Sequence, residues 1–279
     1  MVCVIGAATW DELVEVVHVP ERGMGSSCGR VLREVPGGAG ATAAAWVCAT
    51  GRAARLVCGL GADQAGEQVA TACLQRGIEM LVSPCEQTAH RTMMVDGNGT
   101  SVQRVNPDPH QLRIRWEALG AEPLSGASDL AFVDVADADD RARAHERCLG
   151  RRVLPAEHAP EEAGPGRRWT YVVGSVEDFE LLDAGVLEAV GARGAVLDGG
   201  RDEGRLWLPW RGWTRISPSL DADSGFSTQT HDAFVGGALA ALDIGLALAD
   251  AARVGARCAD ACSFQDHGWP FPGSLLGFN

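Results

Sequence analysis

Thr230-His231-Asp232-Ala233-Phe234-Val235-Gly236-Gly237-Ala238-Leu239-Ala240-Ala241-Leu242 is the most informative segment of the chain. It predicts a long helix of small residues with Asp232 on the first turn. The first N–H groups of a helix lack partners within the helix and carry roughly half a positive charge, so anions bind there. A carboxylate at this position can act as a base beside a phosphate that the same helix end holds. The alternative is an aspartate that only caps a buried helix.

The composition of the 279-residue chain fits a globular α/β protein, because 46% of the residues are hydrophobic. The formal net charge of −13 argues against a nucleic-acid partner, since phosphate backbones are bound by basic surfaces. No apolar run reaches the roughly 20 residues that a membrane span needs. The first residues also lack a basic region followed by an apolar one. We therefore expect a cytoplasmic protein with no membrane partner.

All 24 basic residues are arginine. The lack of lysine excludes a Walker A lysine, a Schiff-base lysine and a pyridoxal-phosphate site. The nine cysteines include no Cys-x-x-Cys pair, which favours free thiols in a reducing compartment. Cys258 and Cys262 precede His267, but no fourth ligand for a metal is evident.

Apolar strands alternate with helical segments along the chain, which predicts a mainly parallel sheet covered on both faces. A hairpin is expected near residues 92–100, with its turn at Gly97-Asn98-Gly99, and an irregular hairpin between residues 12 and 35. Residues 157–168 are charged and contain Pro and Gly, so they predict a surface loop. One helix is expected over residues 177–190, and two helices, separated near Gly245, over residues 232–265.

Three glycine-rich segments precede the Asp232 helix: Gly37-Gly38-Ala39-Gly40-Ala41-Thr42-Ala43, Gly59-Leu60-Gly61-Ala62-Asp63-Gln64-Ala65-Gly66 and Gln75-Arg76-Gly77-Ile78. They resemble the Gly-Gly-x-Gly-Ala-Asn-x-Ala, Gly-x-Val-Gly-x-Asp-x-x-Gly and Gly-Val motifs of the PfkB/ribokinase family of sugar and nucleoside kinases. The Asp232 helix is similar to the end of that family's Asp-Thr-x-Gly-Ala-Gly-Asp-Ala-Phe-x-Gly-Gly signature. The resemblance covers nearly the entire chain. It implies a single α/β domain over residues 1–279 with the ribokinase-like three-layer fold, a mainly parallel central sheet and a small β lid from residues 12–35 and 88–106.

The resemblance also implies a function: a kinase that uses ATP and Mg²⁺ to phosphorylate a hydroxyl of a small sugar, a sugar-like compound or a nucleoside. Asp232 would be the general base. The implied substrate-binding residues are Asp11, Gly37, Gly38, Thr42 and Arg104; the implied nucleotide- and phosphate-binding residues are Thr230, His231, Ala233, Gly200 and Gly204; and Asp178 would organise the metal. Asp11 as a solvated loop residue and Arg104 as an exposed arginine are the alternatives. Members of the family often dimerise through the lid, which leaves a homodimer open here.

The chain departs from the family pattern next to the catalytic position. Gln229-Thr230-His231 replaces Gly-Ala-Gly, whose backbone N–H groups face the transferring phosphate. Phe226 replaces the aspartate that often opens the motif, Thr42 replaces an asparagine, and Ser175-x-x-Asp178 replaces Asn-x-x-Glu. Three interpretations stay open: a protonated His231 that replaces the lost donors, a different phosphate donor or acceptor, or a fold that has lost phosphoryl transfer.

Other classes of protein fit less well. Residues 38–43 match the Gly-x-Gly-x-x-Ala of dinucleotide-binding folds, but Pro36 stands where a buried strand should end, and Asp63 lies in a glycine-rich turn. A serine hydrolase lacks its Gly-x-Ser-x-Gly elbow. The serious rival is a non-catalytic protein of this fold that binds a sugar or a nucleotide.

Overall fold

The structure is a computed structural model that describes residues 1–19, 29–96, 101–106, 114–164, 166–217, 229–263 and 269–270. The predicted turn at Gly97-Asn98-Gly99 and the substitution at Phe226 lie outside these residues.

Among the described residues, nine strands form one central sheet, and the seven from β11 to β5 in the order below run parallel. Across the sheet the strands are β13 (Gly212–Ile216), β12 (Gly204–Leu208), β11 (Ala195–Asp198), β10 (Tyr171–Ser175), β9 (Arg151–Pro155), β8 (Leu130–Val133), β1 (Val2–Ile5), β4 (Ala54–Gly61) and β5 (Glu79–Cys85). The predicted mainly parallel sheet is confirmed.

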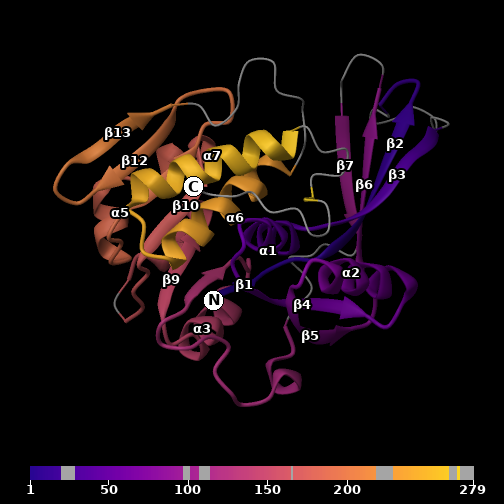
Figure 1. The fold of residues 1–279 in the computed structure, drawn as a ribbon, viewed down its shortest axis with the longest axis horizontal. Helices are drawn as coiled ribbons and strands as arrows, with labels where there is room; N and C mark the ends of the chain where they lie inside the picture. Colours follow the sequence, from indigo (N-terminus) through magenta and orange to yellow (C-terminus); the bar gives the residue numbers. More distant parts are fainter. Residues whose placement is uncertain are drawn as a thin grey trace.

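Helices cover both faces of this sheet, which is why its central strands are apolar along their whole length. Val2 and Val4 of β1 face a core that contains residues of α1 (Ala39–Ala49), α2 (Gln64–Gln75), α6 (Thr230–Asp243) and α7 (Leu248–Ser263). Cys3 and Ile5 face the opposite core, with α3 (Ala138–Arg147), α4 (Ala159–Glu162) and α5 (Ala184–Ala189). Figure 1 shows α1, α6 and α7 together on one face. The molecule is therefore a three-layer α/β/α structure.

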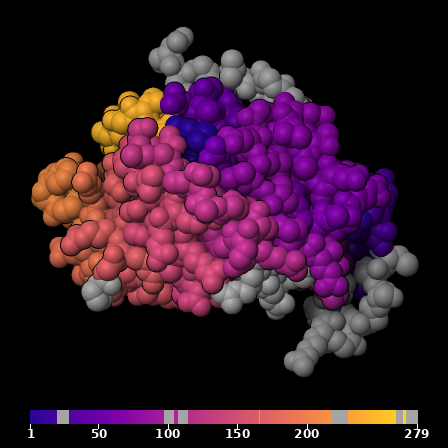
Figure 2. All heavy atoms as spheres, turned by 90° about the horizontal axis from the view of Figure 1, so that it is seen from below, coloured from indigo at the N-terminus to yellow at the C-terminus, as the bar shows by residue number. Residues whose placement is uncertain are grey.

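A second sheet is formed by β3 (Gly29–Gly37), β2 (Thr9–Val16), β6 (Ala89–Val95) and β7 (Ser101–Asn106), in that order. β2 pairs antiparallel with β3 and parallel with β6, and β6 pairs antiparallel with β7. Both segments that were predicted to form a lid therefore contribute strands to one small sheet. It lies at one end of the molecule, and the β12–β13 hairpin lies at the other (Figures 1 and 2).

Two local predictions are wrong. The expected surface loop after residue 157 contains a 3₁₀ turn, Ala156–His158, and the short helix α4. It is held in place because the Nε of the fully buried Arg141 donates to Glu162 at 3.0 Å. The expected helix over residues 177–190 is split into a 3₁₀ helix, Val176–Leu181, and α5, because Asp183 caps a new helix through Val186 N.

No helix among the described residues is both long and apolar enough to cross a membrane.

Candidate active site

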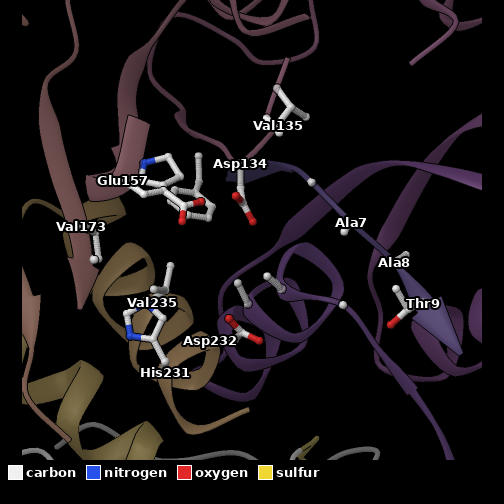
Figure 3. A pocket seen from close by; sticks show the side chains of 18 of the residues that line it. Ala7, Ala8, Thr9, Asp134, Val135, Glu157, Val173, His231, Asp232 and Val235 are labelled. Atoms are coloured by element: carbon white, nitrogen blue, oxygen red, sulfur yellow. The ribbon is translucent and has the colours of Figure 1, made fainter. Parts of the chain in front are cut away.

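The carboxyl ends of the central strands open onto a cavity of about 390 Å³. Ligands of open α/β sheets bind where neighbouring strands connect in opposite directions, and β1 lies at such a point, between β4 and β8. Residues that follow β1, β8, β9 and β10 line the cavity, together with side chains from the small sheet and from α6. In Figure 3 the side chains of Asp134 and Glu157 enter it from one side, and those of His231 and Asp232 from the other.

Asp232 lies on the first turn of α6, as predicted, and lines the cavity. The helix begins after Gln229, whose side chain makes no capping hydrogen bond. The N–H of Ala233 donates to the carbonyl of Gln229 at 3.0 Å, which is the first i→i−4 hydrogen bond of the helix. The cavity therefore contains both a carboxylate and a helix N-terminus, which attracts anions.

Burial raises the pKa of Asp232 above its ordinary value. The charges of His231 and Arg91 act in the opposite direction, and the Asp11 carboxylate adds to the rise. A carboxyl with a raised pKa is a stronger proton acceptor than a solvated one, which suits a general base near neutral pH.

His231 is partly exposed, and its Nδ1 lies 3.5 Å from Oδ2 of Asp198 at the end of β11. Burial by itself lowers the pKa of the imidazole, but Asp198, Asp232 and Asp178 outweigh it, and the net shift is upward. Asp198 also accepts the N–H of Gly200 at 3.0 Å, and Gly200 has a φ of 57° that favours glycine. A protonated His231 would place a cation beside the start of α6.

Asp11 is buried, and its carboxylate already has several partners. Oδ1 accepts the hydroxyl of Thr9 at 2.6 Å, while Oδ2 accepts Nε2 of Gln229 at 3.2 Å and forms an ion pair with Arg91. Gly37 packs so closely that a Cβ there would clash with this carboxylate. Asp11 therefore connects β2, β6 and the residue that precedes α6.

Four of the predicted site residues line the cavity: Gly38, Asp178, His231 and Asp232. The others do not: Asp11, Gly37, Thr42, Arg104, Gly200, Gly204, Thr230 and Ala233. Thr42 is fully buried and accepts Nε1 of Trp269 at 2.9 Å, and Arg104 is exposed on β7. The roles predicted for these residues stay predictions.

Five charged residues of the cavity were not found from the sequence: Arg91 in β6, Asp134 and Asp137 after β8, Asp140 in α3, and Glu157 after β9. Burial raises the pKa of Asp134 to about 7, and the Glu157 and Asp232 carboxylates act in the same direction. The available signal was the position of Asp134 directly after an apolar strand, where α/β proteins place binding residues.

Carboxylates near the cavity have the chemistry that a hard cation prefers. Ligand atoms of Asp134, Glu157 and His158 lie within 4.8 Å of one another. Asp178 uses Oδ2 to accept the N–H of Ser175 at 3.1 Å, in a capping box that begins the 3₁₀ helix, and it still lines the cavity. The residues present therefore fit a divalent ion.

The sequence matches no protein-family model and no curated protein, but the fold is similar to several solved structures. A nucleoside kinase of Methanocaldococcus jannaschii, an archaeal member of the ribokinase family, superposes with a TM-score of 0.76 at 13% identity, over 96% of this chain and 92% of that chain. Ribokinase of Cryptococcus neoformans in complex with ADP gives a TM-score of 0.74 at 16% identity, over 96% of this chain and 94% of that chain. Ribokinase of Thermotoga maritima gives a TM-score of 0.73 at 18% identity, over 97% of this chain and 96% of that chain. The chain has the ribokinase-like fold.

Proposed function

We propose that the chain is an ATP-dependent kinase that phosphorylates a hydroxyl of a small sugar, a sugar-like compound or a nucleoside, with Asp232 as the general base. The observation that carries the proposal is Asp232 itself, on the first turn of α6 and at the wall of the cavity. The similar folds of sugar and nucleoside kinases support the class of reaction.

In the proposed reaction Asp232 takes the proton of the acceptor hydroxyl. The acceptor oxygen then forms a bond to the γ-phosphorus of ATP, the bond from that phosphorus to the bridging oxygen breaks, and ADP leaves. The first N–H groups of α6 and the imidazole of His231 would bind the phosphates. Gly200, in the turn after β11, and Gly204, the first residue of β12, would lie beside the nucleotide.

Asp11, Gly37, Gly38 and Thr42 are the proposed acceptor side of the site, with Arg104 at its margin. Asp178 would hold the magnesium ion of the nucleotide, since its carboxylate lines the cavity. When bound, this ion neutralises charge on the ATP phosphates.

The small sheet is proposed to act as a lid in a single-domain chain, because Thr9 and Arg91 from two of its strands reach the cavity. We also propose that the lid joins two copies of the chain. The supporting observation is that Val31 and Leu32 of β3 are 49% and 44% exposed, and that Val17, directly after β2, is 82% exposed.

Magnesium-dependent ATP consumption with a panel of sugars and nucleosides tests the proposal. We expect turnover with at least one acceptor, and loss of that turnover in a folded Asp232→Asn protein. ATP consumption that Asp232→Asn leaves intact would contradict the role of the base.

A second candidate is a protein of this fold that binds a sugar or a nucleotide without phosphorylating it. It is favoured by the contact of Gln229 Nε2 with Asp11, which places a side chain between the proposed anchor and the start of α6. Calorimetry separates the two functions: binding of a sugar or nucleotide, with no turnover for any acceptor, would support the second.

A further inference from the structure

We propose that Arg91 is a catalytic residue of the phosphoryl transfer. Its guanidinium donates hydrogen bonds to the phosphoryl group during the transfer, and Asp11 holds the guanidinium in position. The inference rests on the proposed function and assigns a role to a residue that the sequence motifs do not contain.

The first observation is the placement of Arg91. β2 and β6 run parallel with Asp11 directly opposite Arg91, so both side chains emerge on the same face of the small sheet. Arg91 Nη2 pairs with Asp11 Oδ2, and the arginine side chain is only 16% exposed. An arginine on a rigid strand, fixed by a buried carboxylate, is oriented before any ligand arrives.

The second observation is what Arg91 faces. Among the described residues that line the cavity it is the one arginine, and the carboxylates there include Asp134, Glu157, Asp178 and Asp232. The positive charge of Arg91 partly offsets the rise that burial causes in the pKa of Asp232. The group that Asp232 would activate is therefore within electrostatic reach of the guanidinium.

The third observation is unused hydrogen-bonding capacity. Arginine carries five N–H donors, and Asp11 uses only the Nη2 end. The Nε of Arg91 is inaccessible to solvent, so the terminal Nη groups are the donors that a ligand could reach. They belong to a side chain that lines the cavity. The oxygens of a transferring phosphoryl group are a partner that matches these donors.

This role would compensate for the substitution at Gln229-Thr230-His231, where residues with side chains replace the glycines of the family motif. The negative charge that develops on the phosphoryl oxygens needs donors or cations, and a guanidinium supplies both. It also explains why Asp11 has its carboxylate so fully engaged by Thr9, Gln229 and Arg91.

The test compares Arg91→Gln and Arg91→Lys with Arg30→Gln, which removes an exposed arginine of the same sheet from its ion pair with Glu15. For Arg91→Gln we expect kcat to fall about 10²–10³-fold, with KM values for acceptor and ATP changed less than about 3-fold. Arg91→Lys should recover only part of kcat, because lysine keeps the positive charge but lacks the planar pair of N–H donors of the guanidinium. Arg30→Gln should match the wild type.

A pH profile adds a readout that a purely structural role would not move. The charged groups that face Asp232 are His231, Arg91, Asp11 and Asp134. Removing Arg91 takes away a charge that favours the Asp232 carboxylate, so the acid limb of kcat/KM should shift to higher pH.

Calorimetry with Mg–ADP and aluminium fluoride, a mimic of the transferring phosphoryl group, separates this inference from the proposed function. We expect Arg91→Gln to weaken binding of the mimic by about 10-fold or more and to leave Mg–ADP alone unchanged. An Arg91-dependent affinity for the mimic, without turnover for any acceptor, would overturn the proposed function and support the contact. The role of Arg91 would be overturned by a wild-type kcat in Arg91→Gln or by a rise in the acceptor KM alone. It would also be overturned if Arg91→Gln lost affinity for Mg–ADP and for the mimic to the same extent. Arg91→Lys gives the same test if Arg91→Gln does not fold.

Discussion

Asp134 is the carboxyl that the fold perturbs most clearly. Its pKa is about 7 in the folded protein, against 3.8 for an ordinary aspartate, and burial is the largest cause. Between these two values the folded protein holds a proton that the unfolded chain has lost. The free energy of unfolding should therefore fall as the pH rises through this window, by on the order of 1–3 kcal/mol, and level off above it.

Urea denaturation between pH 4 and pH 8, with a chelator present, measures this effect. In Asp134→Asn the free energy of unfolding should decrease much less over this pH range, and the variant should be more stable than the wild type at pH 8. Asp202→Asn, at an exposed aspartate, is the control and should follow the wild type. The same decrease in wild type and Asp134→Asn would contradict the assignment.

The sequence could predict Asp232 but not Asp134, Glu157 or Arg91. Asp232 stands in a motif and on a helix whose first turn can be read from local residues. Asp134 in the sequence is only the residue after an apolar run. Its neighbours in space come from the 3₁₀ turn after β9 and from α6, and that proximity depends on the strand order, which no local pattern contains.

Among the elements, Asp63 fixes the start of α2 to the start of β6. Its carboxylate accepts the N–H of Gly66 at 2.8 Å and the N–H and hydroxyl of Thr88 at 2.7 Å each. Burial raises its pKa, but these hydrogen bonds outweigh burial, and the net shift is downward. The stabilisation by Asp63 is therefore present above about pH 4 and is lost as the pH falls through the lowered pKa.

Replacing Asp63 by Ala should lower the free energy of unfolding by about 1–3 kcal/mol at pH 7, because it removes the cap and leaves the partners unbonded. Thr88→Val keeps the backbone bond to Asp63 and should cost less. Denaturant titration measures both, and an unchanged midpoint for Asp63→Ala would show that the bonds contribute nothing.

α1 and α6 pack closely because Gly236 has no side chain. A Cβ there would lie 2.5 Å from the carbonyl oxygen of Ala43 and 2.8 Å from Cβ of Trp46. We expect Gly236→Ala to lower the free energy of unfolding by about 1–3 kcal/mol, because the helices would have to separate. Calorimetric melting measures this against Gly164→Ala, at an exposed glycine where an added Cβ would meet no atom within 4 Å and should leave the stability nearly unchanged. A Gly236→Ala protein as stable as the wild type would contradict the close packing.

The elements themselves were largely predictable. The two helices at residues 232–265 are separated near Gly245 as predicted: α6 ends at Asp243, α7 begins at Leu248, and Gly245 has a φ of 83°. The failures have one physical cause: Asp183 begins a new helix, and Arg141 fixes α4, through side-chain contacts that helical propensity does not report.

In the described part of the whole molecule, β3 is an edge strand of the small sheet, and its Val31 and Leu32 are exposed. An exposed edge of this kind is usually covered or charged. We expect a dimer in sedimentation equilibrium, and Leu32→Arg should shift it towards the monomer. Leu74→Arg, at an exposed leucine of α2, should leave the dimer intact. A wild-type monomer at all concentrations up to about 100 µM would contradict the dimer.

The most direct measurement is mass-spectrometric detection of the phosphorylated acceptor, with ADP counted in the same reaction, for the wild type and for Asp232→Asn. The account predicts one phosphorylated product per ADP for the wild type and a rate lower by about 10²–10⁴-fold for Asp232→Asn at unchanged melting temperature. ADP without a phosphorylated acceptor, or equal rates for the two proteins, would contradict it.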